Sequence, residues 1–577
     1  MLNDLARSLS QFAESPRCRM ALALVAIVPA FVLAALIYTF SFNIPYLDQW
    51  EVYDLYSRYH HHSLTFADLF AQHSEHRMFF PRLFFIAAFY FEPYTDLVLL
   101  WMSWFLSCLS ALCLWRLARF TGWSDSKGLL LLIGANALIF NILAFEDWLW
   151  GFQIGFLLPV FCVTAAVSFV ATSKGVWSFF WAGFWSVINS FSVGAGLTTW
   201  LIIFPLLLFP EGKFRIRWTG LFLHLLAFGL CSFLYLHGYV KPTAYVGSSV
   251  TSDPAGAVVY FLIYVGGPFG IGSLRASLVA GSFLVVMYLC CALLLIRFIN
   301  QAHIVARTLP WLTLAHYGLV CAAATTVGRM CFGPWQALSS RYVVFSSLIP
   351  IGLLFAGACL FPALVHRLKS PRLRQVLGIV IVAIPLICFA RYVWVATAGI
   401  SVWRHIYWSR SQSKAAVVFI NLPYAAPVLN EVTYPHAEDL KVFLDIRNQL
   451  GPPLTVLPGP VLSSLEDSSS PNVSTGLVSA IVPVSDGHMI SGWAYLPDSH
   501  RPTDLILVTL PDQQNQDAVV GMALPETPDP ALAKSLHCHR SVPLKWTIFV
   551  RSGPNLNGLK AWSFDGQTYR AHQILLR

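Results

Sequence analysis

The sequence predicts a polytopic α-helical membrane protein with about eleven transmembrane helices, followed by a C-terminal segment outside the cytoplasm that ends in a small all-β sandwich domain. Three observations support this fold class: an apolar composition, repeated apolar runs as long as a bilayer is thick, and a late change to alternating hydrophobicity. Hydrophobic residues make up 56% of the 577 residues, charged residues make up 11%, and the mean hydropathy is +0.63. Soluble domains usually carry about 25% charged residues, so most of this chain is expected to face lipid or other apolar helices.

The apolar runs supply the expected spans, because a helix needs about 20 apolar residues to cross the hydrocarbon core, with a range of roughly 17 to 25. Long runs occupy residues 20–42, 97–115, 128–145, 154–172, 218–239, 276–296, 309–327, 342–364 and 376–390. Two shorter runs, 176–188 and 197–210, are expected to form a pair of helices that meet at a tight glycine-bearing turn. Residues 255–270 are apolar but rich in glycine, so we expect an interfacial or re-entrant helix there.

The basic residues predict the orientation, since cytoplasmic loops of membrane proteins carry an excess of Lys and Arg. Arg7, Arg17 and Arg19 precede the first run and place the N-terminus in the cytoplasm. Every later loop that then falls inside is also basic, and an odd number of spans puts the C-terminus outside. The first run is too long, and lacks the small-residue cleavage site, to be a removed signal peptide. The expected location is a bacterial cytoplasmic membrane, crossed many times.

These boundaries divide the chain into a cytoplasmic N-terminus at 1–19, a transmembrane domain at 20–396 with an extracytoplasmic loop at 43–96, an extracytoplasmic helical segment and linker at 397–470, and a β-sandwich domain at 471–577. Residues 437–449 have the pattern of an amphipathic helix. Short alternating runs predict strands at 477–484, 488–495, 504–510, 545–550 and 559–564. Trp493, Trp546 and Trp562 fall in these runs, where core packing is the expected role and an exposed sugar-stacking surface is the alternative.

The formal net charge of +9 does not indicate a nucleic-acid partner, because the basic residues sit in short clusters between apolar runs rather than along one face. Most of the twelve cysteines lie within expected spans, where cysteine acts as a small hydrophobe. The sequence holds no zinc-type cysteine spacing, no phosphate-binding glycine loop and no dinucleotide fingerprint. A cytoplasmic ATP-driven machine is therefore not expected.

The first outer loop carries the most informative polar residues. Asp48 directly follows the first run, and an acid in that position can act as a general base on an acceptor hydroxyl or hold a divalent cation. Glu75 and His76 offer further base or ligand atoms, and Arg77 offers a forked donor suited to phosphate. The alternative for each is a solvated loop residue with no chemical role.

A second outer cluster follows the third run and contains Glu146, Asp147, Trp150 and Gln153. A tryptophan at that depth is also typical of the interfacial belt of membrane proteins. The adjacent pair of acids is less usual, and we expect it to face a cavity shared with Asp48.

A third outer cluster consists of Arg329, Arg341 and Tyr342, which flank one short loop. Lys and Arg are usually enriched in cytoplasmic loops, so two arginines on the outer face are unusual and suggest an anionic binding partner. A lipid-linked phosphate at the membrane face would satisfy them. Structural pairing with Glu146 or Asp147 is the alternative.

Topology and motifs together resemble the GT-C class of membrane glycosyltransferases, which carry an acidic residue in the first outer loop and use polyprenyl-phosphate sugar donors. The resemblance covers the topology of residues 20–396. The motifs that carry it are Tyr46-Leu47-Asp48-Gln49-Trp50, Glu75-His76-Arg77, Trp150-Gly151-Phe152-Gln153 and Ser340-Arg341-Tyr342. Together these motifs also resemble a group of poorly characterised bacterial multi-spanning proteins. A membrane domain with a terminal β domain is similar in outline to the arabinosyltransferases of mycobacterial walls, whose β domains bind carbohydrate.

The resemblance implies transfer of a sugar from a polyprenyl-phosphate donor to a cell-envelope glycan or lipid acceptor at the outer face of the membrane. Asp48 would be the base, with Glu75 or His76 assisting, while Arg329 and Arg341 would neutralise the leaving phosphate. The other expected substrate-binding residues are Gln49, Trp50, Arg77, Glu146, Trp150, Gln153 and Tyr342. Gln49 stands where many members have a second acid, so the match favours a base over a metal site, and a divalent cation stays open as a cofactor.

Two other functional classes stay open. One is a transporter or flippase of a lipid-linked saccharide, and the other is a non-catalytic protein of envelope assembly. Transporters commonly place ionisable residues near mid-membrane, whereas the expected spans here are almost free of charge and the ionisable residues gather at one face. That asymmetry favours a site at the outer face over a path through the membrane.

Overall fold

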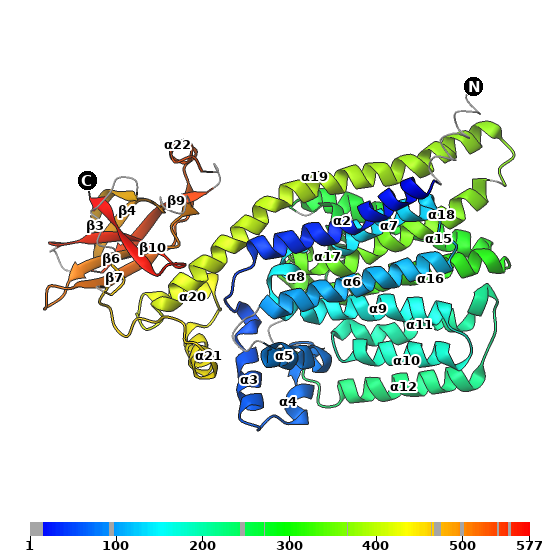
Figure 1. The fold of residues 1–577 in the computed structure, drawn as a ribbon, viewed down its shortest axis with the longest axis horizontal. Helices are drawn as coiled ribbons and strands as arrows, with labels where there is room; N and C mark the ends of the chain where they lie inside the picture. Colours follow the sequence, from blue (N-terminus) through cyan, green and yellow to red (C-terminus); the bar gives the residue numbers. More distant parts are fainter. Residues whose placement is uncertain are drawn as a thin grey trace. The chain divides into compact units, whose positions relative to one another are not determined.

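The computed structural model describes residues 15–91, 97–242, 249–270, 272–365, 367–462, 464–466, 475–496, 501–538, 542–551 and 556–576, and Figure 1 shows its elements. The chain forms two compact units. The first comprises Met1–Ser41, Leu64–Ala88 and Leu97–Trp403, and the second comprises Phe42–Ser63, Phe89–Asp96 and Arg404–Arg577. Arg7 and the expected domain boundary at 470–471 lie outside the described residues.

The first unit is a bundle of helices with one short hairpin. Its helices are α2 (Pro16–Phe40), α4 (Phe66–Phe70), α5 (Phe79–Phe91), α6 (Leu97–Phe120), α7 (Ser126–Ile139), α8 (Phe145–Leu149), α9 (Ile154–Thr172), α10 (Val176–Ser190), α11 (Thr199–Leu208), α12 (Trp218–Leu236), α13 (Pro254–Val265), α14 (Gly267–Gly270), α15 (Leu274–Arg297), α16 (Ala302–Arg329), α17 (Val343–Ser346), α18 (Leu348–Val365) and α19 (Pro371–Val418). The hairpin consists of β1 (Gln72–His73) and β2 (His76–Arg77). Helices α5 and α19 continue into the second unit.

Seven helical segments among the described residues are long and apolar enough to cross a membrane: Pro16–Phe40, Leu97–Phe120, Gly151–Thr172, Trp218–Leu236, Leu274–Arg297, Ser340–Val365 and Pro371–Val418. Each covers one of the expected spans, which confirms the prediction of a helical chain that could pass a membrane several times. The other four expected spans fall on α7, α10, α11 and α16. The first three have 14, 15 and 10 residues, and α16 has 28. The total of eleven spans stays a prediction.

The predicted run 128–145 is wrong as one continuous helix. Helix α7 ends at Ile139, and the side chain of Asn141 accepts a hydrogen bond from the backbone N–H of Leu143 at 3.0 Å. The carbonyl of Asn141 in turn accepts from the indole of Trp148 at 2.8 Å. Asparagine favours such local turns because its side chain competes with the helical backbone. The chain therefore turns here and restarts as α8.

Helices α13 and α14 form in the glycine-rich segment for which the sequence predicts an interfacial or re-entrant helix. Helix α13 has 12 residues, fewer than a membrane span needs. Its backbone touches that of α15, since a Cβ on Gly266 would lie 1.9 Å from the carbonyl oxygen of Ser277. A Cβ on Gly281 would meet the carbonyl oxygen of Leu262 at 1.8 Å. Glycine at both crossing points is therefore required by the close approach of the two helices.

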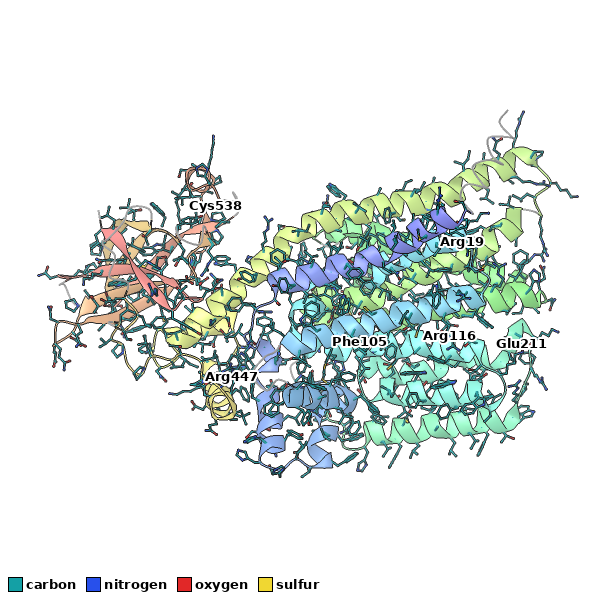
Figure 2. The ribbon with its side chains drawn as sticks, in the orientation of Figure 1. Arg19, Phe105, Arg116, Glu211, Arg447 and Cys538 are labelled. Atoms are coloured by element: carbon teal, nitrogen blue, oxygen red, sulfur yellow. The ribbon has the colours of Figure 1, made fainter. Side chains whose placement is uncertain are left out.

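The basic turns lie together at one end of the first unit. Arg19 donates to the carbonyl of Ser124 at 2.6 Å, and Arg307 donates to the carbonyl of Thr121 at 2.6 Å. Arg116 donates to the hydroxyl of Thr172 at 2.8 Å; Figure 2 shows Arg19, Arg116 and Glu211 toward the same end of the helices. The loops that the sequence assigns to the cytoplasm thus share one end. Which side of a membrane that end faces stays a prediction.

The outer surface of the first unit is strongly apolar along its helices. Phe105 on α6 is 57% exposed, and Phe222, Leu226 and Phe233 on α12 are 65%, 58% and 63% exposed. Exposed apolar patches of this kind mark surfaces that contact another apolar phase. The lateral surface of the bundle is therefore suited to lipid.

The second unit joins short helices to a β domain. Its helices are α3 (Val52–His60), the part of α19 from Arg404, α20 (Ala425–Val432), α21 (Ala437–Leu450) and α22 (Pro530–Ser535). Its strands are β3 (Gly476–Val484), β4 (Gly487–Leu496), β5 (Arg501–Pro502), β6 (Leu505–Pro511), β7 (Asp517–Ala523), β8 (Thr527–Pro528), β9 (Pro543–Val550), β10 (Lys560–Asp565) and β11 (Arg570–Leu576). Helix α21 confirms the amphipathic helix expected at 437–449.

The β domain is one continuous curled sheet, which corrects the expected two-sheet sandwich. The strand order is β7-β6-β10-β11-β3-β4-β9-β8, with β5 paired to β4. The sheet curls until β7 faces β9, where a Cβ on Gly521 would lie 2.8 Å from Ile548. All five expected strands are present as β3, β4, β6, β9 and β10, while β7, β11 and the two-residue strands β5 and β8 were not expected. Trp546 and Trp562 are each 2% exposed and confirm core packing, whereas Trp493 is only half-buried.

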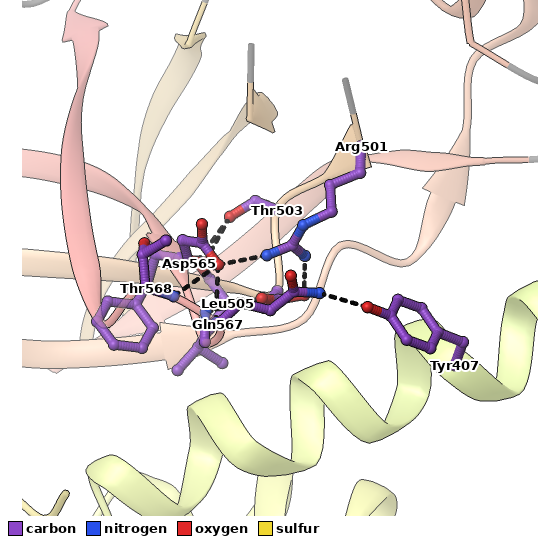
Figure 3. A network of polar contacts seen from close by, with 10 residues as sticks. Tyr407, Arg501, Thr503, Leu505, Asp565, Gln567 and Thr568 are labelled. Atoms are coloured by element: carbon purple, nitrogen blue, oxygen red, sulfur yellow. Dashed lines mark hydrogen bonds and ion pairs between the residues drawn. The ribbon is translucent and has the colours of Figure 1, made fainter. Parts of the chain in front are cut away.

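A buried ion network fastens the β domain to α19 within the second unit (Figure 3). Arg501 donates to Asp504 at 2.5 Å and also pairs with Asp565, while the backbone N–H of Gly566 donates to Asp504 at 2.7 Å. A Cβ on Gly566 would lie 2.7 Å from the carbonyl oxygen of Ser411, so glycine lets the β turn reach the helix. Beside it, the Gln567 amide donates to the Tyr407 hydroxyl at 3.2 Å.

We expect Arg501→Met to destabilise the β domain by roughly 3–5 kcal/mol, because it leaves the fully buried Asp504 without its counter-charge. The measurement is the urea dependence of proteolysis of the full-length protein in detergent. The matched control is Arg570→Met, since Arg570 is exposed on the same sheet and should change the free energy of unfolding little. Equal unfolding curves for the two variants would contradict a stabilising network.

Candidate functional site

The hairpin of β1 and β2 carries two of the predicted catalytic residues, Glu75 and His76. The strands pair antiparallel with His73 opposite His76, and Ser74 takes a positive φ of 50° in the turn. The Tyr235 hydroxyl on α12 donates to the backbone carbonyl of Glu75 at 2.6 Å. The hairpin is therefore held in one place on the bundle instead of lying free in solvent.

Arg77 is the main clamp between this hairpin and α12. It is 7% exposed, and its guanidinium donates to the carbonyls of Tyr235 at 2.9 Å, His237 at 2.5 Å and Phe70 at 3.1 Å. The last turn of a helix leaves carbonyls without partners, and Arg77 satisfies two of them. Its donors are committed to the protein backbone, so the geometry supports a positioning role for Arg77 better than contact with a phosphate.

Glu75 forms the central ion pair of the site with Arg329, at the end of α16. The Nε of Arg329 donates to Glu75 Oε1 at 3.1 Å and its Nη2 donates to the same oxygen, while the Ser74 hydroxyl donates to Oε2 at 2.6 Å. Burial alone would raise the pKa of Glu75, but His76, Arg329 and Ser74 together outweigh it and lower the pKa. Glu75 is therefore an ionised carboxylate and a weak base.

His76 is neutral at physiological pH. Burial is the largest cause that lowers its pKa, to about 4, and Arg329 and Arg341 lower it further, while Glu75 opposes them. Its Nδ1 accepts a hydrogen bond from the backbone N–H of Gly194 at 3.0 Å, so the proton resides on Nε2, which lies 3.6 Å from Glu75 Oε1. The lone pair of His76 is thus already used within the protein.

Glu146 organises the loop that carries Arg341. Its Oε2 accepts hydrogen bonds from the Ser339 hydroxyl at 2.9 Å, the Ser340 hydroxyl at 2.7 Å and the backbone N–H of Arg341 at 3.1 Å. A carboxylate that accepts several hydrogen bonds at the start of a helical turn is a strong cap. Glu146 therefore holds the 3-10 turn at Ser340–Tyr342 in place, and this contact supports the structural alternative for that residue.

Asp147 differs sharply from its neighbour. It is fully buried, and within the described parts of the chain neither carboxylate oxygen has a hydrogen-bond partner. Burial is the main cause that raises its pKa well above the usual value; the charge of Glu146 adds to the rise, and Arg341 opposes it. An isolated buried carboxylate is too costly to keep ionised, so Asp147 is held as a neutral acid.

Aromatic rings cover one side of these charged groups. Tyr342 is 6% exposed and stacks on Tyr264 of α13 with ring centroids 5.1 Å apart, and on Phe156 at 6.5 Å. The Tyr260 hydroxyl, one turn earlier on α13, is buried without a hydrogen-bond partner among the described residues. The sequence argument missed both tyrosines of α13, although their i, i+4 spacing in an otherwise apolar segment was a readable signal.

Trp150 and Gln153 lie inside the bundle. They are 2% and 3% exposed, and the Trp150 ring stacks on Phe152 with centroids 6.0 Å apart. Phe152 stacks in turn on Phe85 of α5 at 5.5 Å. A residue of the interfacial belt would face lipid, so the burial of Trp150 argues against that alternative. Both side chains therefore belong to the buried interior of the bundle.

Asp48 belongs to the second unit, with Gln49 and Trp50. It lies half-buried on a 3-10 turn, Leu47–Gln49, whereas Gln49 and Trp50 are 3% and 0% exposed. Leu47 takes a positive φ of 44°, which is unusual for a branched residue, and its N–H donates to the carbonyl of Thr433 at 3.2 Å. The strained turn is therefore anchored to the segment after α20.

The surroundings of Asp48 are polar and aromatic. The Tyr434 hydroxyl donates to Glu51 at 3.0 Å, and burial, followed by Glu51 and then Asp48, raises the pKa of this tyrosine. The Arg410 guanidinium of α19 lies over the ring of Tyr46, 3.2 Å from its centroid. Glu51, Tyr434 and Arg410, like Asp48, belong to the second unit.

The structure sorts the predicted site residues into two clusters. One, in the first unit, holds the predicted residues of the second and third outer clusters and the hairpin: Glu75, His76, Arg77, Glu146, Asp147, Trp150, Gln153, Arg329, Arg341 and Tyr342. The other contains Asp48, Gln49 and Trp50. A cavity shared by Asp48 and the acids of α8 stays a prediction.

An apolar cavity of about 460 Å³ enters the first unit between α7, α15, α18 and α19. Its lining is almost entirely hydrocarbon and includes Phe269 of α14. Nearby, Arg391 donates to the carbonyl of Phe269 at 3.1 Å. A Cβ on Gly267 would lie 3.8 Å from Val343, the residue after Tyr342, so α14 connects this cavity to the loop of Arg341.

Within the described ranges, no group of three or more His, Cys, Asp or Glu side chains is placed to hold a metal ion, and a divalent cation stays a prediction. No protein-family model, no curated protein and no solved structure matches this chain.

Asp147→Asn and Glu146→Gln should change the stability of the protein in opposite directions at neutral pH. The raised pKa of Asp147 gives a stabilisation that is complete below its unfolded pKa of about 3.9 and is lost as the pH rises through the folded pKa. Asp147→Asn has no proton to lose, so its melting temperature should match that of the wild type in acid and exceed it increasingly at higher pH. Glu146→Gln should instead lose about 1.5–3 kcal/mol at neutral pH, because three donors lose a charged acceptor. Thermal unfolding in detergent across pH tests both; a loss of stability in Asp147→Asn at neutral pH would show that the carboxylate is ionised.

Proposed function

We propose that the protein is a membrane glycosyltransferase that takes a sugar from a polyprenyl-phosphate donor and transfers it to a cell-envelope glycan or lipid acceptor at the outer face of the membrane. The observation that carries the proposal is the gathering of Arg329, Arg341 and their partners at the end of the bundle opposite the basic turns, beside an apolar cavity. A polyprenyl phosphate combines a phosphate group, which suits the arginines, with an apolar chain, which suits the cavity. The residues that resemble GT-C enzymes lie at this end or in the cluster around Asp48.

Arg329 and Arg341 are the proposed phosphate ligands. Guanidinium groups bind phosphate through a planar fork of donors, and both side chains are positioned by acids, Arg329 through the carboxylate of Glu75 and Arg341 through its backbone contact with Glu146. Positioning in advance keeps the entropy lost on binding small. Glu75 and His76 act in this proposal as positioning residues, since the first is a weak base and the second has its lone pair engaged.

The apolar cavity is the proposed site of the polyprenyl chain. Its lining contains Met, Leu, Phe, Pro and Cys side chains, and its volume of about 460 Å³ lies in the range of binding pockets for small ligands. Each buried methylene group is worth about 0.8 kcal/mol. A few isoprene carbons held here would therefore contribute much of the affinity for the donor.

Asp48 is the proposed general base. It accepts the proton of the acceptor hydroxyl as the oxygen forms a bond to the anomeric carbon of the sugar. The bond from that carbon to the phosphate oxygen breaks, and its electron pair leaves with the polyprenyl phosphate, whose charge the arginines neutralise.

Asp48→Asn should lower kcat by about 10²–10⁴-fold, because the amide cannot accept the proton. The assay is transfer of radiolabelled sugar from polyprenyl-phosphate hexose or pentose in proteoliposomes. Asp54→Asn is the matched control, since Asp54 lies in the same segment but its carboxylate is half-exposed and paired with Arg58 at 2.9 Å. Unchanged turnover in Asp48→Asn would rule out this base, and movement of the lipid-linked saccharide across the bilayer without transfer would favour the transporter.

Filling the apolar cavity should weaken binding of polyprenyl phosphate about tenfold. Ala358→Phe places a ring among the lining side chains and displaces roughly two methylene groups, or about 1.6 kcal/mol of transfer free energy. Ala363→Phe, on the same helix but outside the lining, is the control. Binding is measured as Kd in nanodiscs. Equal affinities of the two variants would place the lipid chain elsewhere.

A further inference from the structure

Residues 213–218, which lead into the start of α12 in the first unit, alternate cations with large apolar side chains. The segment reads Lys-Phe-Arg-Ile-Arg-Trp. No helix or strand forms at 213–217, and the backbone at Lys213 is extended, with φ −107° and ψ 131°. An extended chain places successive side chains on opposite sides. We therefore expect the cations along one side of this segment and the apolar groups along the other.

The apolar side chains of the segment are exposed instead of packed in the bundle. Phe214 is 62% exposed, Ile216 is 39% exposed and Trp218 is 76% exposed. The neighbouring Glu211 lies toward the end of the bundle that holds the basic turns (Figure 2). Aromatic residues are enriched where a bilayer meets water, because their rings suit the level of the head groups. The rings of this segment are thus placed for contact with lipid.

The cations of the segment are not neutralised by acids of the protein. Within the described residues, Lys213, Arg215 and Arg217 enter no ion pair. The nearby carboxylate of Glu211 is already paired with Lys174 at 3.0 Å. Four cations therefore accompany one carboxylate here, and the excess positive charge calls for an anion from outside the chain.

Backbone contacts fix the segment to the bundle. Gly212, directly before it, has a positive φ of 76°, and a Cβ there would lie 1.8 Å from the carbonyl oxygen of Ala302 on α16. The backbone N–H of Arg215 donates to the carbonyl of Leu208 at 2.8 Å. Because the segment is held in place before any ligand arrives, binding costs little conformational entropy.

Helix α12 itself has few protein contacts to hold it at a fixed depth. Four of its 19 residues are buried, namely Leu221, His224, Cys231 and Tyr235. The far end of this helix matters for the candidate site, because Arg77 of the hairpin donates to the carbonyl of Tyr235 at 2.9 Å. A lipid bound at the start of α12 would therefore help to position the hairpin as well.

We propose that residues 213–218 bind an anionic phospholipid in the leaflet at this end of the protein. The three cations hold its phosphate, and the rings of Phe214 and Trp218 pack against its acyl chains. A zwitterionic phospholipid carries an ammonium group that the cations repel, so the segment should prefer the anionic lipid. The donor site of the proposed function lies at the opposite end of the bundle, so this inference holds whether or not the protein transfers sugar.

The test is native mass spectrometry of the full-length, delipidated protein in detergent, titrated with phosphatidylglycerol or with phosphatidylcholine. We expect the first phosphatidylglycerol to bind several-fold more tightly than the first phosphatidylcholine. Glycerol 3-phosphate, which has no acyl chains, should not bind at the same concentrations. Lys213→Gln combined with Arg215→Gln should weaken phosphatidylglycerol binding about thirtyfold, which corresponds to about 1 kcal/mol for each lost charge. Both positions are exposed, so the change should not disturb folding.

Lys369→Gln combined with Arg372→Gln is the matched control. It removes the same charge from an exposed turn that has no aromatic residue between its cations, and it should bind phosphatidylglycerol as the wild type does. Trp218→Ala should weaken binding of both lipids, because it removes a contact with the acyl chains. Equal affinities for the two lipids, or equal affinities of the two double variants for phosphatidylglycerol, would overturn the proposal. Neither result bears on the transfer assay, so the two proposals fail separately.

Discussion

The ion pair between Glu75 and Arg329 is the interaction on which the rest of the candidate site depends. Arg329 ends a helix of the bundle, and its guanidinium is partly buried, so it needs a carboxylate nearby. Glu75 can meet it only because Arg77 and Tyr235 fix the hairpin to α12. One local contact therefore orders a loop that the sequence alone would leave in solvent, and it places His76 where a neutral imidazole is the stable form.

The contrast between Glu146 and Asp147 follows from their hydrogen-bond partners and burial. The first accepts three hydrogen bonds in the loop of Arg341, while burial raises the pKa of the second well above its usual value. A buried acid with a raised pKa beside other charged groups is a recurrent feature of functional sites. Here one acid holds the loop of Arg341 in place and the other lies buried beside it.

The two units differ in where they place their charged residues. The first is apolar on its lateral surface and confines its charges to the two ends, as expected of a chain that contacts lipid. The second buries charge only in a closed network, in which Arg501 satisfies Asp504 and Asp565 against α19.

Much of this architecture was determined by the sequence alone. Apolar runs of bilayer length fall on helices, the glycine-rich segment 255–270 forms short helices instead of a span, and alternation marks five of the strands. Composition and periodicity are local properties, so a reader of the sequence can detect them. The Arg329–Arg341 pair at the ends of one loop was readable for the same reason.

The tertiary structure decided the rest. It separated Asp48 from Glu75 into different units, assigned Arg77 to backbone carbonyls, and brought Tyr264 onto Tyr342 across 78 residues of chain. It also joined the β strands into one curled sheet, because the pairing of β11 with β3 links segments that are distant in sequence. Protonation of Asp147 follows from burial, which no neighbouring residue in the sequence specifies. Such properties depend on which groups meet in space, and only the folded chain determines that.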